Sequence, residues 1–231
     1  MTAYAITPWQ LPAVPVAGGN ELFPVRHIYC VGRNYAEHAR EMGANPEREA
    51  PFFFTKAADQ IVPGGGKIPY PPRTKNLHHE IELVVAIGNE GADIAVAATR
   101  DYIFGYAIGV DLTRRDLQIA ARDKGRPWDT GKSFANAAPI GAIHPAAEIG
   151  HPRGGRIEFR VNGAMRQRGD LADMIWSVDE IIAELSTYYP LLPGDLIFTG
   201  TPAGVGAMAP GDRGEGSIEN LDTIKIEIAK G

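Results

Sequence analysis

Residues 80–87 read EIELVVAI, and this segment decides the fold class because it is the strongest run of apolar and β-branched residues in the chain. The two-residue period of a strand places Glu80 and Glu82 on one face, opposite four large aliphatic side chains. The glutamate face continues with Val84 and Ala86, which are also apolar. We therefore predict a strand that is buried on both faces and carries two carboxylates into the interior.

Strand candidates outnumber helix candidates along the rest of the chain. Apolar or alternating runs predict further strands at residues 26–31, 52–54, 102–110, 156–161, 195–199 and 218–228. Helices are predicted where residue pairs suited to capping occur, at Asn34 with Glu37 (a helix ending at Gly43), Thr113 with Asp116, and Ser177 with Glu180. Strands and helices do not alternate regularly. This order favours an α+β, β-dominated fold with a mixed sheet folded into a roll or barrel, and disfavours a doubly wound parallel sheet.

The length and composition predict one domain with an appendage. The chain has 231 residues, of which 44% are hydrophobic, and this is enough for one sizeable core. Residues 1–24 are proline-rich and irregular, which indicates an extended N-terminal arm. No internal repeat follows, so we predict a single domain over residues 25–231.

Charge and cysteine content exclude several classes of protein. The net charge is −5, so no basic surface of the kind that binds nucleic acid or an anionic membrane is expected. No run approaches the roughly 20 apolar residues of a membrane-spanning helix, and no N-terminal targeting pattern is evident. Cys30 is the single cysteine, which excludes an internal disulfide and suits a reducing compartment. We therefore expect a cytoplasmic protein with neither nucleic-acid nor membrane partners.

The two strand glutamates, together with Asp111 at the end of the next predicted strand, form a candidate metal site. Two buried carboxylates on one face repel each other unless they are paired, protonated or bound to a cation. Three carboxylates form the hard oxygen ligand set that Mg²⁺ or Mn²⁺ prefers. The alternative is that Glu80 and Glu82 are solvated and that Asp111 only caps a helix.

His38 and Glu41 lie three residues apart on a predicted helix and therefore share a face. A carboxylate that accepts a hydrogen bond from one imidazole nitrogen raises the basicity of the other, as a general base requires. The alternative is an ordinary surface pair. His78 and His79 are possible softer ligands for zinc, but neighbouring strand residues point to opposite faces, so at most one of them could join the glutamates.

Cationic and amide side chains surround the acidic positions in the sequence. They suit a small dianionic substrate and a developing oxyanion, although they could also be counter-ions for surface acids. Residues 199–206 form a glycine-rich turn that could bind an anion, but they lack the lysine and helix of a phosphate loop. Serine and cysteine nucleophile motifs are also lacking. The side chains in question are Arg33, Arg115, Gln118, Arg122, Arg126 and Lys132.

Five segments, in this order and spacing, resemble the fumarylacetoacetate hydrolase superfamily. The resemblance covers residues 25–231 and is greatest to the small, single-domain acylpyruvate hydrolase branch, in particular to the fumarylpyruvate hydrolases of gentisate degradation. It implies the β-rich roll of the fumarylacetoacetate hydrolase C-terminal domain, with residues 25–231 as the catalytic domain. The segments are YCVGRNYAEHAREMG (29–43), NLHHEIELVVAIG (76–88), GYAIGVDLTRRDLQ (105–118), GRPWDTGKSF (125–134) and PGDLIFTGTPAGVG (193–206).

The resemblance implies a role for individual residues. The metal ligands would be Glu80, Glu82 and Asp111. The catalytic group would be His38, Glu41 and Lys132, with the first two in a lid over residues 36–50. Substrate binding would fall to Arg33, Tyr35, Arg115, Gln118 and Thr201. The sequence departs from the family after Phe54, where TKAAD replaces the commoner Lys-Pro pairing, although Lys56 remains.

The resemblance implies Mg²⁺-dependent hydrolysis of a carbon–carbon bond in a 3-acylpyruvate, with fumarylpyruvate as the favoured substrate. Mn²⁺ or Ca²⁺ would be possible substitutes for Mg²⁺. A distal carboxylate on the acyl group would need a cation, either Arg33 or Arg126. The same site could instead serve oxaloacetate decarboxylation or the isomerisation of a 2-hydroxy-diene-dioate, and a noncatalytic dicarboxylate-binding module is a third alternative. The proline-rich arm and the resemblance favour a homodimer.

Overall fold

The computed structural model describes residues 3–41 and 49–230, and it confirms the predicted β-dominated class. The helices are short, and the described strands fall into four sheets. The strands are β1 (Ala13–Pro15), β2 (Leu22–Pro24), β3 (Ile28–Gly32), β4 (Phe52–Lys56), β5 (Ile61–Pro63), β6 (Gly65–Pro69), β7 (Leu77–His79), β8 (Ile81–Ile87), β9 (Ile103–Val110), β10 (Thr113–Arg114), β11 (Ala138–Ile140), β12 (His144–Pro145), β13 (Arg156–Val161), β14 (Ala164–Asp170), β15 (Leu196–Phe198), β16 (Gly206–Met208), β17 (Arg213–Ile218) and β18 (Thr223–Ala229). The α-helices are α1 (Ala36–Glu41), α2 (Arg115–Arg122), α3 (Asp129–Lys132), α4 (Ala146–Ile149) and α5 (Val178–Tyr188), and 3₁₀ turns occupy Ala58–Gln60, Val96–Tyr102 and Leu171–Asp173.

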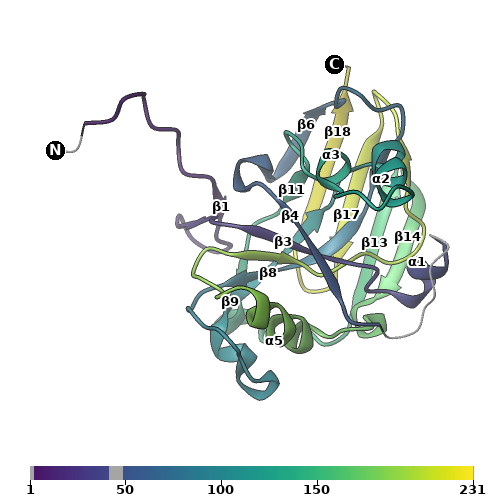
Figure 1. The fold of residues 1–231 in the computed structure, drawn as a ribbon. Coiled ribbons are helices and arrows are strands. Elements are labelled where there is room, and N and C mark those ends of the chain that lie inside the picture. The colour runs from purple at the N-terminus through teal and green to yellow at the C-terminus, as the bar shows by residue number, and fades with distance from the viewer. Residues whose placement is uncertain (1–2, 42–48, 231) are drawn as a thin grey trace.

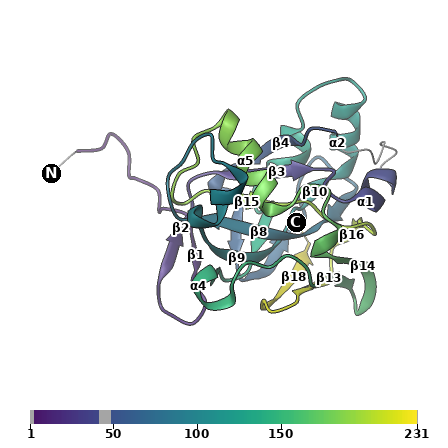
Figure 2. The ribbon, with the colours of Figure 1, turned by 90° about the horizontal axis from the view of Figure 1, so that it is seen from below.

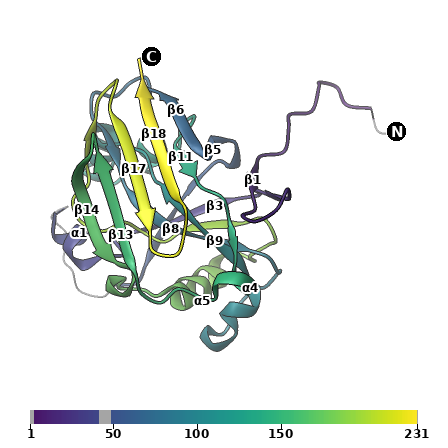
Figure 3. The same cartoon turned by 180° about the vertical axis from the view of Figure 1, so that it is seen from behind.

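Two large mixed sheets pack against each other. The first has the order β4-β3-β15-β8-β9-β11-β5, with β12 also paired to β9, and the second has the order β14-β13-β17-β18-β6. In Figure 3 the strands of the second sheet run up the molecule, while β3, β8 and β9 cross behind them (Figure 1 gives the opposite view). Parallel pairs, such as β3 with β15, occur beside antiparallel pairs, such as β8 with β9. The mixed, curled sheet is the predicted roll.

Strand β8 lies between two apolar cores, as its sequence predicts. All seven of its residues are buried. Ile81 and Leu83 belong to the core shared with the second sheet, whereas Val84 belongs to a smaller core that includes Val14 and Phe23 from the N-terminal hairpin. The face that carries the glutamates is therefore an interior face.

The predicted arm, residues 1–24, contains a short hairpin of β1 and β2. Figure 2 shows this hairpin at one edge of the molecule, near α4, with the chain before it extending away from the body. Val14 and Phe23 of the hairpin are buried, whereas Trp9 is 80% exposed. None of the described helices is long and apolar enough to cross a membrane.

The predicted starts of two helices are wrong, because the side chains expected to cap them bond to other parts of the chain. Asn34 does not cap the first helix, which begins at Ala36, because its amide bonds to Trp176 and to the Thr199 carbonyl. The second helix begins at Arg115 without a side-chain cap. Asp116 instead accepts hydrogen bonds from the Thr74 hydroxyl and two backbone N–H groups.

Of the predictions for the C-terminal third of the chain, one strand is wrong and one helix cap is right. Residues 218–228 are not one strand, because β17 and β18 are joined by a turn at residues 219–222. The capping box predicted at Ser177 is confirmed at the start of α5, since Ser177 accepts from the Glu180 N–H and Glu180 accepts from the Ser177 N–H. Gly43, the predicted end of the first helix, lies outside the described residues.

Candidate metal centre and active site

Three carboxylates converge where two neighbouring strands meet. Glu80 lies between β7 and β8, Glu82 lies on β8, and Asp111 follows β9 directly. The antiparallel pairing of β8 with β9 aligns these positions, and the Asp111 N–H donates to the Glu80 carbonyl over 2.8 Å. One ligand oxygen from each carboxylate lies within 4.8 Å of the others, and all three residues are at most 4% exposed.

Buried cations surround this cluster. Lys132 Nζ lies 2.7 Å from Glu80 Oε2 and 2.6 Å from Asp111 Oδ2, so one ammonium group bridges two carboxylates. Arg115 pairs with the other oxygen of Glu80. Lys56 Nζ lies 2.7 Å from Asp111 Oδ1 and is also fully buried. These contacts hold Glu80 and Asp111 in place.

The three carboxylates differ in their electrostatic surroundings. Burial alone would raise the pKa of Glu80, but Lys132 and Arg115 outweigh this effect and lower that pKa below its ordinary value. Burial, together with the charges of Asp111 and Glu80, raises the pKa of Glu82 well above its ordinary value. The backbone N–H of Gly200 donates to Glu82 Oε2 over 2.8 Å. Glu82 is thus the carboxylate with the greatest need for a further positive charge.

The cluster fits a divalent metal ion. Its donors are carboxylate oxygens that are close together and buried, the ligand type that Mg²⁺ and Mn²⁺ prefer. No histidine belongs to the clustered ligands found among the described residues. His78 bonds to Asn76 and accepts from Arg115, and His79 bonds to Gln167. The possible zinc ligation by these histidines therefore receives no support from the geometry.

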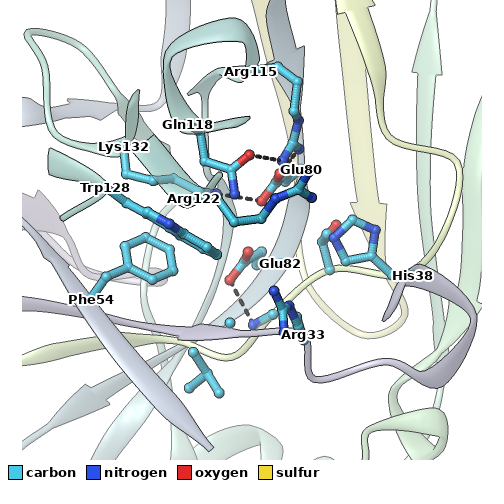
Figure 4. Close-up of a pocket in the computed structure, with 14 residues that line it drawn as sticks. Arg33, His38, Phe54, Glu80, Glu82, Arg115, Gln118, Arg122, Trp128 and Lys132 are labelled. Carbon is cyan, nitrogen blue, oxygen red and sulfur yellow. Dashed lines mark hydrogen bonds and ion pairs between the residues drawn. The ribbon is translucent and has the colours of Figure 1, made fainter. Parts of the chain in front are cut away.

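His38 and Glu41 form the predicted pair on α1. His38 Nδ1 donates to Glu41 Oε2 over 3.2 Å, and Glu41 also accepts from the Gly204 N–H at 3.1 Å. The hydrogen bond from His38 lowers the pKa of Glu41, which keeps this carboxylate ionised. His38 is 6% exposed and lines the same hollow as Glu80 and Glu82 (Figure 4). Of the predicted lid, residues 42–48 lie outside the described residues.

The predicted substrate-binding residues have different positions. Gln118 lines the hollow, and its Oε1 accepts from Arg115, while its N–H₂ group has no hydrogen-bond partner within residues 3–41 and 49–230. Thr201 lines the hollow too, but its hydroxyl already donates to the Ile81 carbonyl. Tyr35 is 2% exposed and is not among the lining residues. The hollow is lined by Val31, Gly32, Arg33, His38, Phe54, Glu80, Glu82, Arg115, Gln118, Arg122, Trp128, Lys132, Gly200 and Thr201.

Sequence reasoning missed two residues that support the site. Lys56 receives no role in the sequence analysis. Its spacing from Phe54 and Phe52 is two and four residues on β4, so all three share a face, and this spacing could have indicated that Lys56 points toward the site. Gln167 on β14 accepts from His79 and from the Ile81 N–H, and it donates to the Thr201 hydroxyl. No local pattern marks Gln167, because its partners are distant in the sequence.

The β-rich roll contains a buried cluster of three carboxylates, held by lysine and arginine side chains and lying beside a His–Glu pair. These features define a class of proteins with a divalent-metal site that has oxygen ligands. The chain belongs to the fumarylacetoacetate hydrolase family, since the model "Fumarylacetoacetate (FAA) hydrolase C-terminal" matches residues 27–231.

Similar proteins with assigned names include two kinds of enzyme. A fumarylpyruvate hydrolase of Ralstonia sp. is 47% identical over 180 residues, which cover 78% of this chain and 93% of the relative. A mitochondrial oxaloacetate tautomerase of Rattus norvegicus is 40% identical over 205 residues, which cover 89% of this chain and 92% of the relative. The crystal structure of a fumarylpyruvate hydrolase from Pseudomonas aeruginosa, in complex with Mn²⁺ and pyruvate, superposes with a TM-score of 0.97 at 47% identity and covers 99% of this chain and 100% of that one.

Proposed function

We propose that this protein is a metal-dependent acylpyruvate hydrolase and that fumarylpyruvate is its preferred substrate. The observation that carries the proposal is that His38, held by Glu41, lines one hollow with the carboxylate pair Glu80 and Glu82. This arrangement combines a general base with a metal site. The 47% identity to a fumarylpyruvate hydrolase and the Mn²⁺ and pyruvate in a similar crystal structure support the choice of reaction.

Glu80, Glu82 and Asp111 would hold the metal ion, which we propose is Mg²⁺, with Mn²⁺ or Ca²⁺ as substitutes. When bound, the ion supplies electrophilic chemistry, because it polarises a diketo acid and stabilises negative charge on its pyruvate half. Charge matching supports an anionic substrate. When ionised, the three carboxylates are matched by the buried cations Lys56, Lys132 and Arg115, so a divalent ion leaves an excess of positive charge.

The side chains of the protein would carry the proton and the developing charge. His38 takes a proton from water, and the water oxygen attacks the C4 carbonyl of the acyl group. Lys132 and the N–H₂ group of Gln118 stabilise the resulting oxyanion, and one such donor contributes on the order of 3 kcal/mol when it is preorganised. The C3–C4 bond then breaks, its electron pair remains on C3 of the pyruvate half, and a proton is returned there. Fumarylpyruvate and one water thus give fumarate and pyruvate.

A second candidate function uses the same pyruvoyl-binding site. The 40% identity to an oxaloacetate tautomerase favours a reaction on oxaloacetate, by tautomerisation or decarboxylation. Such reactions share stabilisation of an enolate with acylpyruvate hydrolysis, and they differ in needing no attack of water on a distal carbonyl. A general base would serve either reaction, so the preference for hydrolysis rests on the 47% identity to a fumarylpyruvate hydrolase.

The enol absorbance of fumarylpyruvate provides the test. We expect rapid loss of this absorbance with Mg²⁺ and no loss with a chelator, with acetylpyruvate and oxaloacetate assayed in parallel. Fumarate and pyruvate should appear in equal amounts. Survival of fumarylpyruvate while oxaloacetate is consumed would refute the hydrolase proposal and favour the second candidate.

A further inference from the structure

A second hollow, called the outer hollow, adjoins the metal pocket. Arg33, Phe54, Trp128 and Lys132 line both hollows, so the two share a wall. The outer hollow is also lined by Phe52, Phe53, Thr55, Pro127, Asp129 and Tyr189. A substrate whose pyruvoyl end lies at the carboxylate cluster would extend its other end along this shared wall.

The shared wall is aromatic and closely packed. Phe52 and Phe54 alternate on β4, and their ring centroids lie 5.1 Å and 5.9 Å from that of Trp128 (Phe54 and Trp128 are seen side by side in Figure 4). Lys132 Nζ lies 4.9 Å from the Phe54 ring centroid, which joins the wall to the metal site. The Phe52 ring covers Gly32 so closely that a Cβ there would lie 2.0 Å from it. A wall of this kind offers flat π surfaces to a planar acyl chain.

Arg33 lies beside this wall and lines both hollows. It follows β3 directly, with a left-handed φ of 59°, and its guanidinium carbon lies 5.5 Å from the Phe52 ring centroid. Left-handed backbone is uncommon for a residue other than glycine and is often kept at ligand sites. Here the side chain of the neighbouring Asn34, bonded to Trp176 and the Thr199 carbonyl, fixes the chain.

The charge of Arg33 is not matched by any carboxylate in the described part of the chain. Arg115 and Lys132 pair with carboxylates of the metal cluster, and Arg122 pairs with Asp123. No ion pair joins Arg33 to a carboxylate of residues 3–41 or 49–230. Arg126, the other cation that the sequence suggested for a distal carboxylate, is exposed and lines neither hollow.

We propose that Arg33, Phe52 and Trp128 form the subsite for the acyl arm of the substrate, and that this subsite selects a planar, unsaturated arm ending in a carboxylate. The inference rests on the proposed function and deepens it, because it identifies what distinguishes one acylpyruvate from another. The guanidinium group binds the distal carboxylate through charge-assisted hydrogen bonds, and the aromatic wall holds the conjugated chain.

The test compares two substrates that differ only in this arm. Fumarylpyruvate carries the distal carboxylate, whereas acetylpyruvate ends in a methyl group. Arg33→Gln should lower the ratio of kcat/KM for fumarylpyruvate to kcat/KM for acetylpyruvate by about 10- to 100-fold, the range expected for one lost charge-assisted hydrogen bond. The loss should appear mainly in KM, and Arg33→Lys, which keeps the charge, should retain part of the preference. Arg126→Gln is the matched control and should keep the wild-type ratio.

The outcomes separate this inference from the proposed function. An unchanged ratio in an active Arg33→Gln protein, or an equal fall for both substrates, would overturn the subsite. A fall of the same size in Arg126→Gln would assign the distal carboxylate to the other cation. A wild-type protein that cleaves neither acylpyruvate would instead refute the proposed function and remove the basis of the subsite.

Discussion

At the scale of single residues, Glu82 differs from Glu80 although both line the same hollow. Glu80 is held by Arg115 and Lys132, whereas Glu82 accepts from the Gly200 N–H and faces the charge of Asp111. Removing the charge of Glu82 should therefore relieve repulsion, whereas removing that of Glu80 should leave Arg115 without its carboxylate partner and Lys132 with Asp111 alone.

We expect Glu82→Gln to lower the affinity for Mn²⁺ by more than about 100-fold, because the loss of a direct ligand should exceed the 10- to 100-fold loss that residues supporting a ligand cause. With a chelator present, the denaturant concentration at the unfolding midpoint of Glu82→Gln should equal or exceed that of the wild type. Glu80→Gln is the contrasting variant and should lose about 3–5 kcal/mol of stability, because a buried pair loses one partner. Titration calorimetry measures the Mn²⁺ affinity, and denaturant unfolding measures the stability. Wild-type Mn²⁺ affinity in Glu82→Gln would contradict the ligand assignment.

His38 should matter for turnover and not for metal binding. His38→Ala should lower kcat for fumarylpyruvate by roughly 10²- to 10⁴-fold, the usual contribution of a general base. Its Mn²⁺ affinity should stay close to that of the wild type, because His38 is not among the clustered ligands. Glu37→Gln, an exposed change on the same helix, should keep full activity. Intact turnover in His38→Ala would refute the proposed proton transfer.

Prediction from sequence succeeds at this scale where a residue's role follows from its near neighbours. Strand alternation around Glu80 and Glu82, and helical spacing of His38 and Glu41, indicate which side chains share a face. The pairing of Lys56 with Asp111 and the position of Tyr35 outside the lining depend on the packing of distant segments. Local spacing carries no information about such contacts.

At the scale of elements, Gln167 connects three segments through one side chain. From β14 it reaches His79 at the end of β7, Ile81 at the start of β8, and the turn after β15. The Thr201 hydroxyl completes the link by donating to the Ile81 carbonyl over 2.7 Å. This network fixes the backbone on both sides of Glu80.

Gln167→Leu should destabilise the protein by about 3 kcal/mol, because burial leaves several hydrogen-bonding groups without partners at about 1–3 kcal/mol each. It should also weaken Mn²⁺ binding, since the backbone around Glu80 loses its support. Arg168→Gln, on the exposed side of the same strand, is the control and should change neither property. Wild-type stability and Mn²⁺ affinity in Gln167→Leu would show that the network does not position the ligand.

The elements also show where sequence patterns mislead. The capping box at Ser177 is correct because both of its hydrogen bonds are local. Asn34 has the same kind of capping pattern, but its amide joins the chain after β3 to residues near 176 and 199. The turn after β15 accommodates this contact because Gly200, at a φ of 96°, lacks the Cβ that would lie 2.7 Å from Asn34. A long-range contact therefore overrides the local preference.

At the scale of the whole molecule, the N-terminal segment leaves apolar side chains exposed. Tyr4, Ile6, Trp9 and Leu11 are each at least 67% exposed, and Figure 1 shows this segment extending from the body. Large exposed apolar groups in one segment favour burial against another surface. We propose that a second copy of the chain covers them.

Light scattering after size-exclusion chromatography measures the predicted homodimer directly. The full chain should have twice the monomer mass, and Trp9→Ser with Leu11→Ser should shift the equilibrium toward monomer. Tyr188→Ser, which changes an exposed aromatic residue on α5, should leave the dimer intact. A wild-type protein that is monomeric at every concentration would contradict the proposal.

Hydrolysis requires that water attack the acyl carbonyl of fumarylpyruvate, and isotope labelling measures this step most directly. Fumarylpyruvate is incubated with the protein and Mg²⁺ in H₂¹⁸O, and the products are analysed by mass spectrometry. Hydrolysis predicts one ¹⁸O atom in the new carboxylate of fumarate, formed together with pyruvate and only when metal is present. Fumarylpyruvate that is recovered uncleaved, or merely isomerised, would contradict the assignment.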